Sequence, residues 1–271
     1  FGWIGTAEAV DRLEAAFDSL RRMFRFRGHY YNWYDTKDLR PLDPQYVSSV
    51  DSGNLAGHLI AIANACDEAT RSGPLRDRAL AGIDDALLLV RASLAPEQAG
   101  DLRAELAGVR KALDGRGTPA ERLDRAESRI QALVTATAGL SAAGEENQAR
   151  IWAEAASACI ASHRRDQSVD IGDLNRRLAA LATLARDVAT QMDFRFLMDP
   201  ERQLMSIGYL TTDSSRDPNC YDLLASEARL ASFFAIAKGD APTKHWFRLG
   251  RSTTAVEGSA ALVSWSGSMF E

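Results

Sequence analysis

TPAERLDRAESRIQALVTATA, residues 118–138, carries the clearest helical signal in the chain. Thr118 supplies an N-cap hydroxyl, Pro119 occupies the first helical position, and Glu121 stands three residues after the cap, which together form a capping box. Ala, Leu, Arg and Glu recur at helical spacing through the rest of the middle of the chain. The sequence therefore predicts successive amphipathic helices joined by short turns.

Helix boundaries can also be predicted on either side of this stretch. We expect amphipathic helices at residues 6–24, with Thr6 as the cap, and at residues 52–72. Asp170 with Asp173 predicts another helix start, ahead of LNRRLAALATLARDVATQM. The breaks between helices in the middle zone are marked by Gly115, Gly117 and Gly144.

The region after residue 193 has a different pattern. Two short alternating runs in residues 194–210 flank an Asp-Pro turn signal, which favours a β-hairpin. Asp217 then predicts a helix that begins at Pro218, runs to about Lys238 and ends at Gly239.

The aromatic residues divide the chain into three zones. Ten of the 21 lie in residues 1–50, ten lie in residues 191–271, and Trp152 stands alone between them. Helices without aromatics or clustered polar groups usually support a fold or join domains. We therefore interpret residues 73–165 as a helical insertion or linker bundle, with a coiled-coil-like partner surface as the alternative.

Composition limits the classes of function. The 271 residues suit one large or two smaller soluble domains, and a net charge of −5 without a basic stripe makes nucleic acid an unexpected partner.

The three cysteines, Cys66, Cys159 and Cys220, are too far apart in sequence to form a CxxC pair. They fit a reducing compartment, where we expect them to be small buried side chains. No apolar stretch is long enough to predict a membrane span. The abrupt ends at Phe1 and Glu271 indicate a fragment of a longer protein.

The most distinctive polar and aromatic run is HYYNWYD, residues 29–35, which has no aliphatic residue within it. Aromatic faces beside a carboxylate, an amide and an imidazole can stack on sugar rings and bind their hydroxyl groups. The alternative is an irregular loop that buries its aromatic rings and leaves their polar ends in water. The run alone does not separate the two interpretations.

A second group of candidate residues lies in CYDLLASEARLASFFAIAKG, where Tyr221, Asp222 and Glu227 have apolar neighbours. Desolvation favours a neutral carboxylic acid, which is what a general acid requires near neutral pH. A structural ion pair between Glu227 and an arginine such as Arg229 is the alternative.

The segment KHWFRLGRS could line a sugar subsite through His245, Trp246 and Arg248, or form a structural loop corner. The four histidines show no metal-ligand spacing, so we expect no metal, and no cofactor is predicted. There is no GxGxxG, P-loop or GxSxG motif, which removes the usual support for a nucleotide-binding fold or a serine hydrolase.

Six segments together resemble the glucoamylase-like domain of bacterial cyclic β-1,2-glucan synthases. They are FGWIGTAEAVDRLE, RFRGHYYNWYDTKDLRPLDPQYVSSVDSGNLAGHL, MDFRFLMDPERQLMSIGY, CYDLLASEARLASFFAIAKGD, KHWFRLGR and ALVSWSGSMFE. The resemblance covers both aromatic zones in order, whereas the helical middle matches in character more than in motif.

This resemblance implies an all-α fold: part of an (α/α)6 toroid with an inserted helical bundle and one short β-hairpin. Residues 1–72 would be the first part of the catalytic domain, residues 73–165 the insertion, and residues 166–271 the truncated continuation. The parent would be a very large inner-membrane protein with this part on the cytoplasmic side. The remaining domains of that synthase would be its protein partners.

In function, the resemblance implies ring closure of linear β-1,2-glucan by retaining transglycosylation. A retaining route requires two carboxylates about 5 Å apart. The family pattern assigns the acid/base role to Glu227 and places the nucleophile beyond Glu271, so the piece alone could be inactive. Candidate substrate-binding residues are Trp33, Tyr34, Asp35, Asp51, Asn54, His58, Asp222, His245, Trp246, Arg248, Trp265 and Glu271.

Two alternatives remain open at this point. The domain could hydrolyse β-1,2-glucan, with water replacing a sugar hydroxyl as the acceptor, or it could be a non-catalytic glucan-binding module. Helix capping explains Asp51 and Asp222 as well as substrate binding does, since each lies near a predicted helix start.

Overall fold

A computed structural model describes residues 2–73, 78–94, 100, 102–140, 147–224 and 226–263, with backbone alone at residues 78, 79, 226 and 227. The chain divides into two compact units. Unit 1 comprises residues 1–15 and 67–179, and unit 2 comprises residues 16–66 and 180–271. Helices dominate the described residues and the strands are two to four residues long, which confirms a mostly α fold. The toroid and the boundaries at residues 72 and 165 stay predictions.

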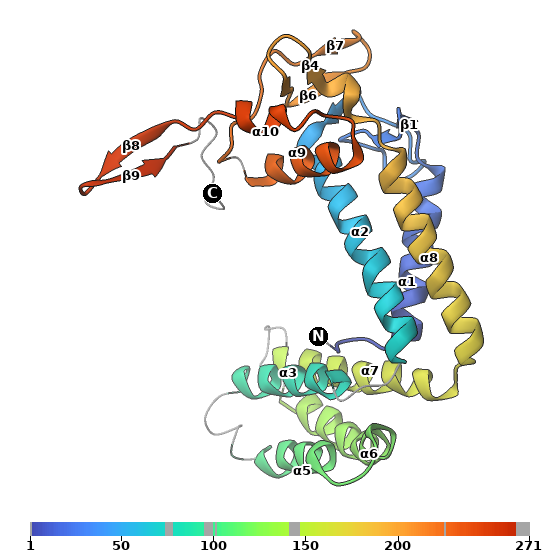
Figure 1. Cartoon of the computed structure of the whole chain (residues 1–271). Coiled ribbons are helices and arrows are strands. Elements are labelled where there is room, and N and C mark those ends of the chain that lie inside the picture. Colours follow the sequence, from blue (N-terminus) through green and yellow to red (C-terminus); the bar gives the residue numbers. More distant parts are fainter. Residues whose placement is uncertain are drawn as a thin grey trace. The chain divides into compact units, whose positions relative to one another are not determined.

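Unit 1 is a helical bundle (Figure 1). Helix α7 packs against both α3 and α6, and α5 packs against α6. The core between them is aliphatic, with Ile83, Val109, Leu123, Ile130 and Leu133 among its fully or almost fully buried side chains. The helices are α3 (Arg78–Ala92), α5 (Arg103–Asp114), α6 (Pro119–Ala138) and α7 (Gln148–Ser168).

Local capping signals account for the helix starts in this unit. The Thr118 hydroxyl accepts from the Glu121 N–H at 3.3 Å, and a Glu121 carboxylate oxygen accepts from the Thr118 N–H at 2.9 Å, which confirms the predicted capping box. At the start of α8 (Ile171–Gln191), the Asp170 carboxylate accepts from the Asp173 N–H at 2.7 Å, as predicted. Gly115 follows α5 and Gly117 has a positive φ, whereas Gly144 lies outside the described residues.

The start of α1 (Thr6–Arg22) differs from the prediction. Thr6 is the first helical residue rather than the residue before the helix, and the Asp166 carboxylate from α7 takes the capping role. Its two oxygens accept from the N–H groups of Thr6 and Ala7, each at 2.8 Å. A carboxylate at this position also interacts favourably with the positive end of the helix dipole.

Unit 2 combines the other helices with short antiparallel strands. Strand β3 (Tyr46–Ser48) pairs with β6 (Gly208–Leu210), which pairs with β7 (Ser215–Arg216). The remaining pairs are β1 (Arg25–Phe26) with β2 (His29–Tyr30), β4 (Met198–Asp199) with β5 (Leu204–Met205), and β8 (Thr253–Val256) with β9 (Ser259–Leu262). Its helices include most of α2 (Ser49–Ser72), together with η1 (Phe194–Leu197), α9 (Ser226–Lys238) and α10 (Lys244–Arg248).

The predicted hairpin at residues 194–210 is confirmed only in its centre. Strands β4 and β5 pair around the Asp-Pro turn, where the Asp199 carbonyl accepts from the Gln203 N–H at 2.8 Å. The first run, residues 194–197, is a 3₁₀-helix instead of a strand, because Asp193 and Asp240 carboxylates accept from its first N–H groups. The prediction of a single hairpin was also wrong, since the described residues contain several.

The predicted helix start at Pro218 was wrong, because α9 begins at Ser226. Asp217 does not cap a helix; its carboxylate accepts from the Asn219 N–H at 2.9 Å and closes a tight turn. Residues 219–223 are held by distant backbone groups: the Asn219 carbonyl accepts from the Ile207 N–H, and the Leu223 N–H donates to the Gly250 carbonyl. The predicted end is confirmed, since Gly239 follows α9 with φ of 85°.

The three cysteines carry no disulfide; Cys66 and Cys159 are buried and Cys220 is partly buried. Within the residues that the structure describes, no helix has the length and apolar character needed to cross a membrane.

A close backbone approach in unit 2 joins α2 to α9. A Cβ atom added to Gly53 would lie 2.4 Å from the Cα of Ala231. The Gly57 position lies against the Leu230 side chain, one turn further along α2. Only a residue without a Cβ permits this spacing at position 53, so the glycine holds the N-terminal part of α2 against α9.

We expect Gly53→Ala to lower the free energy of unfolding by about 1–3 kcal/mol, because the steric overlap outweighs the gain of about 1 kcal/mol in helix propensity. Gly108→Ala in α5 is the matched control. Its added Cβ would meet nothing closer than the Arg129 Cδ at 3.7 Å, so this change should stabilise the protein. Urea denaturation of both variants measures the two effects. A Gly53→Ala variant as stable as the wild type would contradict the packing argument.

Candidate functional site

The N-terminus of α2 and the strand before it form one wall of the candidate site. Strand β3 is held by pairing with β6, where the Tyr46 ring crosses Gly208 so closely that an added Cβ would lie 2.1 Å from it. The Ser48 hydroxyl accepts from the Asp51 N–H at 3.2 Å and caps α2. Asp51 is exposed in the first turn of α2.

The pKa of the Tyr46 hydroxyl depends on its burial and on the charged groups around it. Burial, together with the nearby Asp217, Tyr221 and Asp51, raises the pKa of Tyr46 to about 12, because burial and neighbouring negative charge both disfavour the charged phenolate. The long-range strand pairing thus brings Asp51 into the same neighbourhood as the segment that contains Tyr221. Tyr46 was missed by the sequence analysis, since its role depends on a contact with Gly208 that no local pattern indicates.

A cavity of about 470 Å³ lies beside this wall and contains two predicted site residues, Asp222 and Arg248. The Leu223–Gly250 backbone hydrogen bond of 2.9 Å holds the two segments together. The Asp222 carboxylate accepts from the Leu224 N–H at 3.0 Å. The full lining consists of Leu204, Cys220, Tyr221, Asp222, Arg248, Gly250, Ser252 and Val263. An aromatic face, a carboxylate and a guanidinium in one cavity can bind a polyhydroxylated ligand.

Arg251 positions the segment after α10. Its guanidinium donates to the carbonyls of Trp246, Phe247 and Leu249, at distances of 2.8, 3.3 and 2.7 Å. A cation at the C-terminal end of a helix satisfies carbonyl groups that have no partner within the helix. This arrangement leaves Arg248 exposed at the cavity, with Trp246 partly buried.

His245 is fully buried, in contrast to its neighbours. Its Nε2 lies 2.8 Å from the Ser232 hydroxyl and its Nδ1 lies 3.2 Å from the Gln203 carbonyl. Burial lowers the pKa of His245, because the charged ring is disfavoured away from water. With both ring nitrogens engaged inside the protein, this geometry favours a structural role for His245.

The aromatic run at residues 29–35 is divided between the core and the surface. Tyr34 donates from its hydroxyl to the Phe24 carbonyl at 2.6 Å and accepts from the Tyr31 N–H at 2.9 Å. Asp35 accepts from the Lys37 N–H at 2.8 Å and faces Arg40 at 3.6 Å. Trp33 keeps 49% of its surface exposed. The loop therefore uses Tyr34 and Asp35 to hold its own shape and presents Trp33 to solvent.

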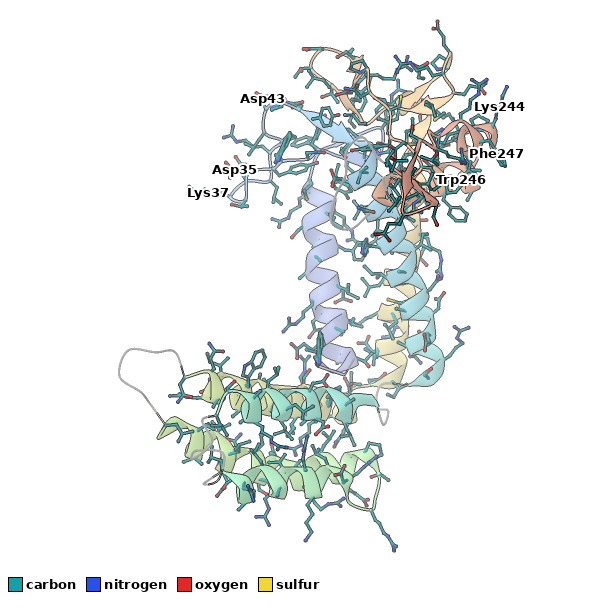
Figure 2. The ribbon with its side chains drawn as sticks, turned by 90° about the vertical axis from the view of Figure 1, so that its left-hand side faces the viewer. Asp35, Lys37, Asp43, Lys244, Trp246 and Phe247 are labelled. Carbon is teal, nitrogen blue, oxygen red and sulfur yellow. The ribbon has the colours of Figure 1, made fainter. Side chains whose placement is uncertain are left out.

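The predicted binding residues of the aromatic loop, such as Asp35, lie apart from those of the segment around Trp246 (Figure 2). Figure 2 shows Asp35, Lys37 and Asp43 on one side of unit 2, with Lys244, Trp246 and Phe247 on the other. Asp35 and Trp246 accordingly belong to separate surfaces.

The remaining predicted residues lie on α2, on α9 or outside the described part. His58 is exposed, with its Nδ1 2.7 Å from the Asn54 carbonyl one turn earlier. Glu227 belongs to the first turn of α9, one turn before Ala231, but its side chain lies outside the described residues. Trp265 and Glu271 also lie outside them. Among the described residues, no group of three or more His, Cys, Asp or Glu side chains is placed to hold a metal ion.

Comparison with known proteins gives an informative relative. The chain is 41% identical, over its whole length, to part of the cyclic β-(1,2)-glucan synthase NdvB of Rhizobium meliloti (strain 1021). This similarity supports kinship with the cyclic β-1,2-glucan synthases. The chain spans about 10% of the length of that synthase. No protein-family profile matches the chain.

His29 supports the candidate site from within the core. It is fully buried between the rings of Phe194 and Phe196, with its Nδ1 2.8 Å from the Ser52 hydroxyl and its Nε2 3.0 Å from the Asp193 carbonyl. Burial lowers the pKa of His29 from 6.5 to about 4. The ring is therefore neutral at pH 7 and links β2 to the start of α2.

We expect the protein to lose stability as the pH falls from 6.5 to 4. The unfolded chain binds a proton at His29 in this window and the folded chain does not, so a contribution of up to about 3 kcal/mol, complete above pH 6.5, is lost. Urea denaturation at several pH values, with His29→Gln for comparison, isolates this contribution. Identical pH profiles of wild type and variant would contradict the assignment.

Proposed function

We propose that this chain is part of a cyclic β-1,2-glucan synthase and that it binds β-1,2-glucan and closes it into rings by retaining transglycosylation. The observation that carries the proposal is the 41% identity to the Rhizobium meliloti synthase across the whole chain. In this proposal the other domains of the parent synthase are its protein partners, and the chain functions at the cytoplasmic side of the inner membrane.

Glu227 is the proposed acid/base residue. It first donates a proton to the glycosidic oxygen as that bond breaks, and it then removes a proton from the hydroxyl that attacks the glycosyl-enzyme. A hydroxyl from the same glucan chain gives a ring, whereas water gives a linear product. Its position on α9 supports the assignment, since the close approach of Gly53 and Ala231 places the adjoining turn of α9 beside the start of α2. The family resemblance assigns the nucleophilic carboxylate to a segment outside this chain.

Glucan binding is proposed at the cavity that Tyr221, Asp222 and Arg248 line. The Tyr221 ring offers a face for stacking on a glucosyl unit. The Asp222 carboxylate and the Arg248 guanidinium supply an acceptor and several donors for adjacent sugar hydroxyls. Asp51 and Asn54, at the start of α2, are proposed to extend this surface, and Trp33 is proposed to contact glucan from its separate loop.

We expect Glu227→Gln in the parent synthase to reduce ring formation at least about 100-fold, because an amide cannot transfer the required proton. Glu201→Gln, at an exposed position of the same unit, is the control and should retain activity. Mass spectrometry separates rings from linear glucan, since each ring is lighter by one water. Wild-type ring formation by the Glu227 variant would refute the assignment. Linear products alone from the wild type would identify hydrolysis instead.

We expect Asp222→Asn to weaken binding of β-1,2-glucan to this chain about tenfold, because the variant loses a charged acceptor while its amide oxygen can still bind the Leu224 N–H. Asp213→Asn, at an exposed position, is the matched control. Isothermal titration calorimetry with a linear glucan measures both. Equal affinity of the wild type and both variants would remove this cavity from the proposed binding surface. Binding that persists in an inactive Glu227→Gln synthase would show that binding and turnover are separable.

A further inference from the structure

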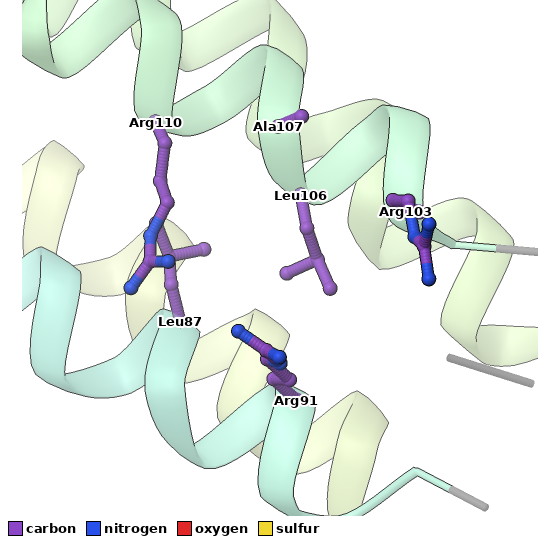
Figure 3. Close-up of a pocket in the computed structure, with 6 residues that line it drawn as sticks. All are labelled: Leu87, Arg91, Arg103, Leu106, Ala107 and Arg110. Carbon is purple, nitrogen blue, oxygen red and sulfur yellow. The ribbon is translucent and has the colours of Figure 1, made fainter. Parts of the chain in front are cut away.

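Unit 1 contains a cavity of about 330 Å³ between α3 and α5 that the proposed glucan chemistry does not use. It is lined by three arginines, Arg91, Arg103 and Arg110, together with Leu87, Leu106 and Ala107. Figure 3 shows Leu106 pointing into the space between the two helices, with Arg91 and Arg110 extending toward it from opposite helices. The volume is at the lower end of the range for small-molecule sites.

The described lining of this cavity carries three guanidiniums and no carboxylate. Arg110 pairs with Asp84, whose carboxylate lies 3.0 Å from its Nε. Among the described residues, Arg91 and Arg103 have no carboxylate partner. Guanidiniums that lie near one another repel. Within the described part of unit 1, only Asp84 offsets this charge, through its ion pair with Arg110. An anion in the cavity would relieve this repulsion.

The start of α5 adds to the same positive potential. Arg103 is the first residue of the helix, where a cation is disfavoured by the helix dipole. The N-cap residue, Leu102, makes no side-chain capping hydrogen bond. A phosphate oxygen is a good acceptor for N–H groups at a helix start.

The floor of the cavity is apolar. Leu87 is 1% exposed and belongs to the core of the bundle, and Leu106 is partly buried against that core. A fully hydrated inorganic anion gains nothing from such a surface, whereas an ester with an apolar group next to its phosphate buries that group there.

We propose that this arginine cavity binds a phosphate monoester with an apolar substituent. The planar guanidiniums of Arg91 and Arg103 donate paired N–H groups to the phosphate oxygens, because a phosphate dianion offers both the charge and the geometry for bidentate hydrogen bonds. Arg110 stays paired with Asp84 and lines the cavity, and Leu87 and Leu106 contact the apolar substituent. The ligand is either a soluble metabolite or the headgroup region of an acidic lipid.

The test uses phenyl phosphate as the probe and the whole chain as the protein, with isothermal titration calorimetry as the measurement. We expect saturable binding that Arg91→Ala and Arg103→Ala each weaken at least about tenfold. Arg103→Lys should also weaken it, since a lysine keeps the charge but loses the paired donors. Arg176→Ala is the matched control, because Arg176 is an exposed arginine of the same unit outside the cavity, and it should bind like the wild type.

Three results would overturn the proposal: no binding of phenyl phosphate by the wild type, an equal loss in Arg176→Ala, or equally tight binding of benzoate. Arg91 and Arg103 are exposed, so their substitution leaves the core intact, and circular dichroism with thermal melting verifies folding. If Arg103→Ala melts early, Arg103→Gln replaces it.

Co-sedimentation with phosphatidylcholine vesicles that contain phosphatidic acid shows whether the phosphate ligand is a lipid headgroup or a soluble metabolite. Vesicle binding that Arg91→Ala abolishes identifies a lipid headgroup, and binding of phenyl phosphate alone identifies a soluble ester.

Discussion

The close approach of α2 to α9 at Gly53 and Ala231 is the constraint on which the candidate site depends. It sets the start of α2, with Asp51 and Asn54, beside the first turns of α9, to which Glu227 belongs. The pairing of β3 with β6 reinforces this arrangement, because it holds the strand that leads into α2 against a strand more than 150 residues away in sequence. Two short contacts between distant segments thereby assemble a surface from residues that have no local relationship.

The polar residues of unit 2 divide into those that are buried in the core and those that line an open cavity. His29 and His245 are fully buried, and their ring nitrogens lie within hydrogen-bonding distance of hydroxyl and carbonyl groups inside the protein. Asp222 and Arg248 line an open cavity instead. Burial makes a neutral imidazole a suitable connector within a core, whereas a charged carboxylate and guanidinium are most stable where water or a polar ligand reaches them.

Unit 1 has a different composition and a different kind of surface. Its bundle is held by aliphatic side chains and by capping groups, and its arginine cavity lies between α3 and α5. The residues that the sequence pattern assigned to support of the fold also include three arginines that line one cavity. Amphipathic spacing predicts which face of a helix is polar, but it does not show which arginines of two helices face the same space.

The sequence by itself determined the features that depend on neighbouring residues. The capping box at Thr118 and Glu121, the helix start after Asp170 and the end of α9 before Gly239 each result from hydrogen bonds or dihedral angles within a few residues. Only the tertiary structure decided that α9 begins at Ser226 and not at Pro218, since residues 219–223 bond to Ile207 and Gly250. It likewise decided the burial of His29 and the convergence of Asp222 with Arg248. These depend on contacts between segments far apart in the chain, which local propensity does not encode.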